Sequence, residues 1–127
     1  MQPQFLTLAE VLEIHRDQIE RYGGDYHLRD YGLLEAAMAM PAAGVRGQYF
    51  HADLFAMAAA YAFHLVSNHP FVDGNKRVGA VAAIVFLKIN GVRLAVRERA
   101  LERLIMGVAQ GKVDKDELAR FFRENSP

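Results

Sequence analysis

Residues 54–87 decide the fold of this chain, and they read LFAMAAAYAFHLVSNHPFVDGNKRVGAVAAIVFL. Two apolar runs in this segment flank the polar and charged residues 69–77. Neither run has a polar face, and helices of that kind belong in the centre of a domain. We therefore predict two buried central helices. Asp53 caps the first, which ends near Asn68, and the second runs from Gly74 to Asn90. The loop between them would be a rigid platform for a functional site.

Four further helices are predicted around this pair from capping residues and stop signals. Thr7-x-x-Glu10 is a capping box that opens the first helix, and Gly23 ends it. Asp30 caps a short second helix that Pro41 stops. The expected helices cover residues 7–23, 30–41, 53–68, 74–90, 97–110 and 114–124, with a loop over 42–51 and an extended connector over 92–96. The predicted fold class is all-α, a bundle of about six helices in a single domain spanning residues 1–127.

The composition indicates a compact intracellular domain. The chain has 127 residues and no cysteine, which excludes a disulfide framework, a thiolate nucleophile and zinc–cysteine sites. It has no signal-peptide pattern and no apolar run approaching ~18 residues, so we expect a cytoplasmic protein without a membrane anchor. Fifteen basic and fifteen acidic residues cancel, which argues against direct binding of nucleic acid.

The loop over residues 69–77 combines side chains suited to an anion. The first N–H groups of the helix beginning at Gly74 or Asn75 have no internal partner and lie at the positive end of its dipole, where they attract phosphate oxygens. Lys76 and Arg77 add charge at the same end. They oppose the dipole there, and a bound anion would account for that conflict. We interpret the loop as a nucleotide phosphate site.

Three other residues of the loop have distinct expected roles. Histidine is suited to proton transfer near neutral pH, so His69 is the candidate general base for a hydroxyl nucleophile. Asp73 is the candidate ligand of a divalent cation that bridges phosphate oxygens, since Mg²⁺ sites often use one or two carboxylates and the phosphates. Phe71 is expected to anchor the loop in the core.

The sequence His69-Pro70-Phe71-x-Asp73-Gly74-Asn75-Lys76-Arg77 resembles the signature loop of the Fic/Doc superfamily. Fic nucleotidyl transferases carry His-Pro-Phe-x-acid-Gly-Asn-Gly-Arg-x-x-Arg. Here Lys76 stands in place of the second Gly, and Ala80 in place of the second Arg. Both departures are typical of the Doc (death-on-curing) branch, whose loop carries Asn-Lys-Arg. Val78 departs from the Thr common in that branch, and residues 5–7, 19–24 and 28–35 extend the resemblance, which implies the Fic/Doc helical fold.

The resemblance also implies an activity. Doc-like proteins are toxins that move a phosphoryl group from ATP to a hydroxyl of a target protein, and the target described for the family is a translation elongation factor, elongation factor Tu. By this resemblance His69 would be the general base, and Asp73 would organise Mg²⁺ or orient the nucleotide. Gly74, Asn75, Lys76 and Arg77 would hold the phosphates. Lys76 fills part of the Fic anion hole, so we expect ATP to present its γ-phosphate to the nucleophile.

A separate antitoxin chain is the expected regulator. Many Fic proteins carry an inhibitory Ser/Thr-x-x-x-Glu-Gly/Asn motif, but here Arg120 stands where Ser or Thr is required before Glu124. As in Doc toxins, inhibition would then come from a second protein that docks a helix into an apolar groove near the loop.

Two other functions stay open from the sequence. One is a Fic-type nucleotidyl transferase (AMPylation) that tolerates Lys76, and the other is a non-catalytic module whose loop holds a phosphate or a partner. A metal hydrolase is disfavoured, because no His-Glu-x-x-His or adjacent His-Asp pair is present. The residues that could suggest one are His51, Asp53, His64, His69 and Asp73. We expect His64 to be a hydrogen-bonded core or rim residue, and the sequence gives His51 no definite role.

Overall fold

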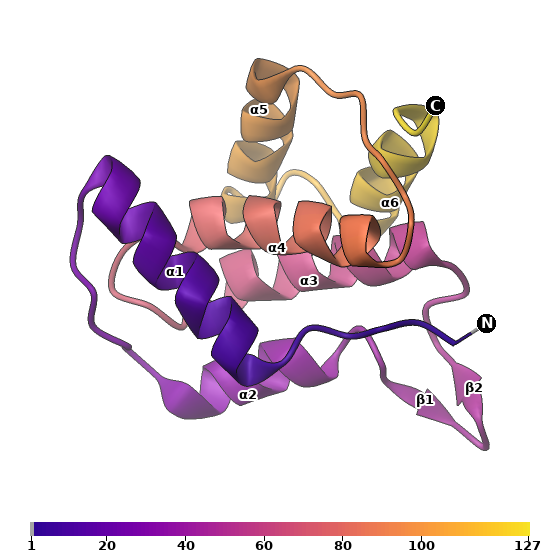
Figure 1. The fold of residues 1–127 in the computed structure, drawn as a ribbon, viewed down its shortest axis with the longest axis horizontal. Coiled ribbons are helices and arrows are strands. Elements are labelled where there is room, and N and C mark those ends of the chain that lie inside the picture. Colours follow the sequence, from indigo (N-terminus) through magenta and orange to yellow (C-terminus); the bar gives the residue numbers. More distant parts are fainter. Residues whose placement is uncertain (1) are drawn as a thin grey trace.

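This computed structural model describes residues 2–127, which contain six α-helices and one short hairpin (Figure 1). The helices are α1 (Leu8–Tyr22), α2 (Tyr31–Ala39), α3 (Leu54–Asn68), α4 (Asn75–Ile89), α5 (Glu98–Ala109) and α6 (Lys115–Glu124). The hairpin consists of β1 (Gly44–Val45) and β2 (Gln48–Tyr49). The all-α fold class and the number of helices predicted from the sequence are confirmed.

The helix ends follow the capping residues. The Thr7 hydroxyl accepts from the Glu10 N–H at 3.1 Å, and the Glu10 carboxylate accepts from the Thr7 N–H at 2.8 Å, so the capping box is complete. The carboxylates of Asp30, Asp53 and Asp114 each accept a backbone N–H in the first turn of the helix that follows. These bonds satisfy donors that a helix cannot satisfy internally.

Helices α3 and α4 lie side by side at the centre, with the other helices around them (Figure 1). Residues 57–62 of α3 are fully buried, as are Val78, Ala82 and Phe86 of α4. Gly79 permits the close approach, because an added Cβ would lie 2.8 Å from Val66 Cγ2 and 3.0 Å from the Ala62 carbonyl oxygen. The loop between α3 and α4 is therefore held by two closely packed helices.

The hairpin replaces part of the loop expected over residues 42–51. Its strands pair Gly44 with Tyr49 and Val45 with Gln48, and the turn holds Arg46 and Gly47 at φ values of 53° and 75°. Two residues per strand are too few to give the alternating pattern by which strands are recognised in a sequence.

Within residues 2–127, no helix is long and apolar enough to cross a membrane.

Candidate active site

The loop over residues 69–77 is attached to the core through Phe71 and His15. The Phe71 side chain is 1% exposed, and the His15 ring of α1 stacks on it with centroids 3.7 Å apart and planes 8° from parallel. His15 Nε2 donates to the Asp73 carbonyl oxygen at 2.9 Å. Burial lowers the pKa of His15, and the Asp73 carbonyl opposes that shift. A neutral imidazole therefore fixes the carboxyl end of the loop.

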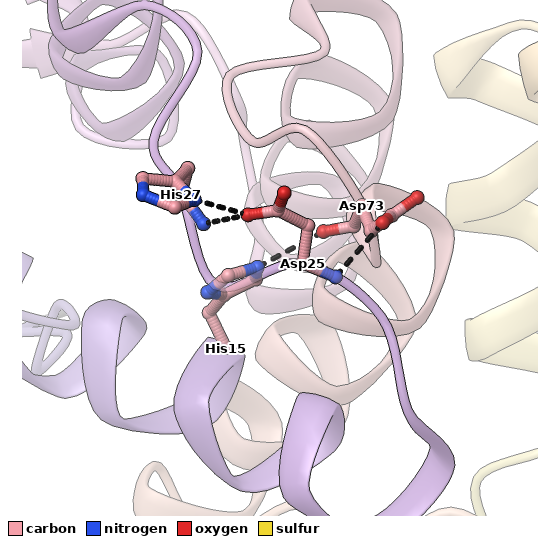
Figure 2. Close-up of polar contacts among 4 residues, drawn as sticks. All are labelled: His15, Asp25, His27 and Asp73. Carbon is pink, nitrogen blue, oxygen red and sulfur yellow. Dashed lines mark hydrogen bonds and ion pairs between the residues drawn. The ribbon is translucent and has the colours of Figure 1, made fainter.

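The segment that follows α1 runs antiparallel to the loop. The Val72 N–H donates to the His27 carbonyl at 3.0 Å, and the Arg29 N–H donates to the Pro70 carbonyl at 2.7 Å. Asp73 Oδ2 accepts from the Asp25 N–H at 2.8 Å, as Figure 2 shows. In the same view the Asp25 carboxylate turns back onto His27, whose N–H groups lower the pKa of that carboxyl. The backbone of residues 25–29 thus contacts one side of the loop, and His15 of α1 contacts another.

Arg29 holds the turn from α3 into the loop. Its Nε donates to the His69 carbonyl at 2.6 Å, and its Nη2 donates to the Asn68 carbonyl at 3.0 Å. These carbonyls lie at the end of α3, where helix carbonyls lack internal partners. His69 adopts the left-handed conformation, with φ 50° and ψ 54°, which a non-glycine residue adopts only when its surroundings stabilise it. Arg29 supplies part of that stabilisation.

Asn75 links the two ends of the loop. Its side chain is 5% exposed. Asn75 Oδ1 accepts from the Phe71 N–H at 3.0 Å, while Nδ2 donates to the Phe71 carbonyl at 2.9 Å and lies 3.0 Å from His69 Nδ1. His69 is exposed, and its Nε2 makes no hydrogen bond within residues 2–127. Asn75 therefore orients the candidate base as well as beginning α4.

The two cations lie in the first turn of α4, which has no side-chain cap. Gly74 precedes it at φ 85° and ψ 9°, and an added Cβ there would lie 3.2 Å from Ile19 Cδ1. Arg77 donates to the Gly23 carbonyl at 3.1 Å and its guanidinium lies 5.4 Å from the centroid of the Tyr22 ring. Lys76 is exposed and makes no hydrogen bond or ion pair within residues 2–127. This helix end offers unpaired N–H groups and one uncommitted cation to an anion.

Comparison with known proteins assigns the fold and this loop to a family. The sequence model of the Fic/DOC family matches residues 5–87, which include the whole loop and the residues described above that contact it. The chain belongs to the Fic/Doc family. It is 46% identical to the protein named Toxin Doc of Mycolicibacterium smegmatis over 101 residues, 77% of each chain. It is 32% identical to the protein named Protein kinase doc of Escherichia phage P1 over 118 residues, 93% of this chain and 92% of the relative. These relatives support the Doc branch.

His51, which precedes α3, and His64, which lies on α3, both contact Lys115, the first residue of α6. The Lys115 ammonium is 3.3 Å from His51 Nε2 and 3.1 Å from His64 Nε2. Burial, followed by the charge of Lys115, lowers the pKa of His51 and lowers that of His64 to about 4. His64 is thus a hydrogen-bonded rim residue, as expected.

No group of three or more His, Cys, Asp or Glu side chains suited to a metal occurs within residues 2–127.

The structure adds positioning residues that the sequence did not suggest. His15, Asp25 and Arg29 contact the loop from 58, 48 and 40 residues away in the chain. Each comes from α1 or the segment after it, where no local pattern distinguishes it from a surface residue. The resemblance of residues 19–24 and 28–35 to Doc sequences was the one signal that this region matters.

Proposed function

We propose that this protein is a toxin that phosphorylates a Ser or Thr hydroxyl of a target protein with ATP and Mg²⁺. The proposed target is elongation factor Tu, whose modification would arrest translation. The observation that carries the proposal is the uncapped start of α4, where Gly74, Lys76 and Arg77 surround unpaired N–H groups beside an exposed imidazole. The relative named Protein kinase doc, similar over nearly the whole chain, supports phosphoryl transfer over other reactions of such a site.

The residues divide the reaction among them. Lys76 and the first N–H groups of α4 would bind the phosphates. The Arg77 guanidinium, which lies over the Tyr22 ring, would add positive charge near them. As the target hydroxyl oxygen forms a bond to the γ-phosphorus, the bond from that phosphorus to the bridging oxygen breaks and ADP leaves with the electron pair. The hydroxyl proton passes to an unprotonated ring nitrogen of His69. Positioning and charge dominate catalysis of such transfers.

Asp73 fits a role beside a nucleotide-bound Mg²⁺. Its Oδ2 is occupied by the Asp25 N–H, and Oδ1 has no hydrogen-bond partner within residues 2–127. A single free carboxylate oxygen suits Mg²⁺, which is commonly bound through one or two carboxylates and substrate phosphates rather than an all-protein cage. The cation would neutralise charge on the phosphates, while Asp73 would orient them.

Labelled ATP and matched variants test the proposal. Purified protein is incubated with bacterial extract and ATP carrying label at either the γ- or the α-phosphate. We expect γ-label on one protein band, with a loss of about 10²–10⁴-fold in His69→Ala. Lys76→Ala should weaken transfer, whereas Lys88→Ala, at the other end of α4, should not. Transfer of α-label would indicate a nucleotidyl transferase. Growth is measured separately in bacteria on induction of the wild type and of His69→Ala. Equal arrest by both would indicate a binding module.

We propose a separate antitoxin chain as the regulator, in keeping with the relative named Toxin Doc. Co-expression with a neighbouring gene product that restores growth and co-purifies with the chain would support this. Arrest that no neighbouring product relieves would contradict it.

A further inference from the structure

The Asn75 amide has only one orientation compatible with its contacts. A backbone N–H can only donate and a carbonyl can only accept. Since the Phe71 N–H lies 3.0 Å from Oδ1 and the Phe71 carbonyl lies 2.9 Å from Nδ2, turning the amide over would place donor against donor and acceptor against acceptor. The side chain is buried, so water could not replace those two bonds. The amide is therefore fixed by the backbone of Phe71.

This orientation determines where the proton of the neutral His69 ring lies. The second N–H of Asn75 Nδ2 points to His69 Nδ1 at 3.0 Å. An amide nitrogen does not accept hydrogen bonds, so Nδ1 must be the acceptor and carry no proton. A neutral imidazole has one N–H, which must then be on Nε2.

We infer that Asn75 is a positioning residue that sets the tautomer of His69, so that the resting enzyme presents Nε2–H, a donor, at the exposed face of the loop. This inference rests on the proposed function, in which His69 takes the hydroxyl proton. Nε2 cannot accept a proton in this tautomer. The ring proton must first leave Nε2 for solvent and another enter at Nδ1, where it would face the Asn75 N–H. The resting loop is thus set to donate to a phosphate oxygen, and the base form is reached only when the Asn75 contact changes.

The chain contains an internal reference for each tautomer. His15 donates from Nε2 to the Asp73 carbonyl at 2.9 Å, so its ring carries the Nε2 proton. The His27 Nδ1 contacts the Asp25 carboxylate, which can only accept when ionised, so its ring carries the Nδ1 proton. Replacing Asn75 by Asp would give His69 the same carboxylate partner. A charge-assisted bond of that kind should shift the tautomer ratio of His69 towards Nδ1–H by roughly ten- to a hundredfold.

Nitrogen-15 NMR of the ring nitrogens, in protein without nucleotide, tests the inference. The spectrum is recorded where all five imidazoles are neutral, and the His69 signals are identified from their absence in His69→Gln. We expect His69 to show Nε2–H and a scalar coupling from Nδ1 to Asn75 Nδ2 across the hydrogen bond. Asn75→Asp should move the proton to Nδ1.

Asn90→Asp is the matched control. Asn90 also donates from Nδ2 to the carbonyl four residues earlier and accepts a backbone N–H, but at the other end of α4. The Asn90→Asp substitution should leave the His69 signals unchanged. A His69 proton on Nδ1 in the wild type, or absence of the coupling, would overturn the inference whether or not Asn75→Asp folds. Because no nucleotide is present, this result is independent of whether the labelled-ATP experiment supports phosphoryl transfer.

Discussion

Acid should destabilise this protein through His64, and the size of the effect can be worked out from its surroundings. Burial, with the charge of Lys115 added, lowers the pKa of His64 from 6.5 to about 4. The unfolded chain therefore binds a proton at this residue as the pH falls below 6.5, whereas the folded chain does not until about pH 4. The unfolding free energy must fall through that window and level off below it.

Without solvent screening, the lowered pKa of His64 would reduce the unfolding free energy by roughly 3 kcal/mol across this pH window, at ~1.4 kcal/mol for each pH unit. Because His64 is only partly buried, solvent screens the charge, and we expect about 2 kcal/mol. The comparison is between the wild type and His64→Gln, since His15 and His51 also have a lowered pKa and titrate in both proteins. Lys115→Met should shrink the effect without abolishing it, because burial is the larger cause.

Urea unfolding from neutral pH to about pH 4 measures this difference. The wild type should lose about 2 kcal/mol more than His64→Gln over the window. An NMR titration of the His64 ring should place its midpoint near pH 4 in the wild type and higher in Lys115→Met. An equal loss of unfolding free energy in the wild type and His64→Gln would refute the reasoning. So would an NMR titration midpoint of the His64 ring near 6.5 in the wild type.

Three further predictions concern the platform and the loop. Gly79→Ala should cost about 1–3 kcal/mol in urea unfolding, since its Cβ would lie 2.8 Å from Val66 Cγ2, whereas Gly32→Ala, with only one contact at 3.4 Å, should not destabilise α2. Phe71→Ala should cost about 3–5 kcal/mol by thermal or urea unfolding, because a fully buried ring leaves a cavity under the loop. Arg29→Lys should lower the rate of label transfer with a smaller stability loss than Phe71→Ala, because lysine cannot reproduce the fork to the Asn68 and His69 carbonyls. An unchanged transfer rate in Arg29→Lys would mean that the turn after α3 does not need this clamp.

The local features of the fold could be predicted from the sequence, whereas the contacts that orient the loop could not. The capping residues Thr7, Asp30, Asp53 and Asp114 act within three residues of themselves, so their spacing contains the information. The central helices could be predicted because burial on all sides leaves no polar face. The roles of His15 and Arg29 depend instead on how α1 and the segment after it pack against the loop. No pattern local to residues 15 or 29 encodes that arrangement.

The two cations of the loop are not equivalent in the free protein. Arg77 already donates to the Gly23 carbonyl and lies over Tyr22, so part of its charge is directed at the end of α1. Helix carbonyls at a C-terminus are a favourable partner for a cation, and this contact joins α1 to the start of α4. Lys76 has no such contact within residues 2–127, and its charge at a helix N-terminus opposes the dipole. Its position is unfavourable for the helix alone and favourable once an anion is bound. In the function proposed above, Arg77 would therefore hold the geometry of the loop while Lys76 would be left to bind phosphate. The lysine at the position of the Fic glycine would then have the larger effect on how a nucleotide binds.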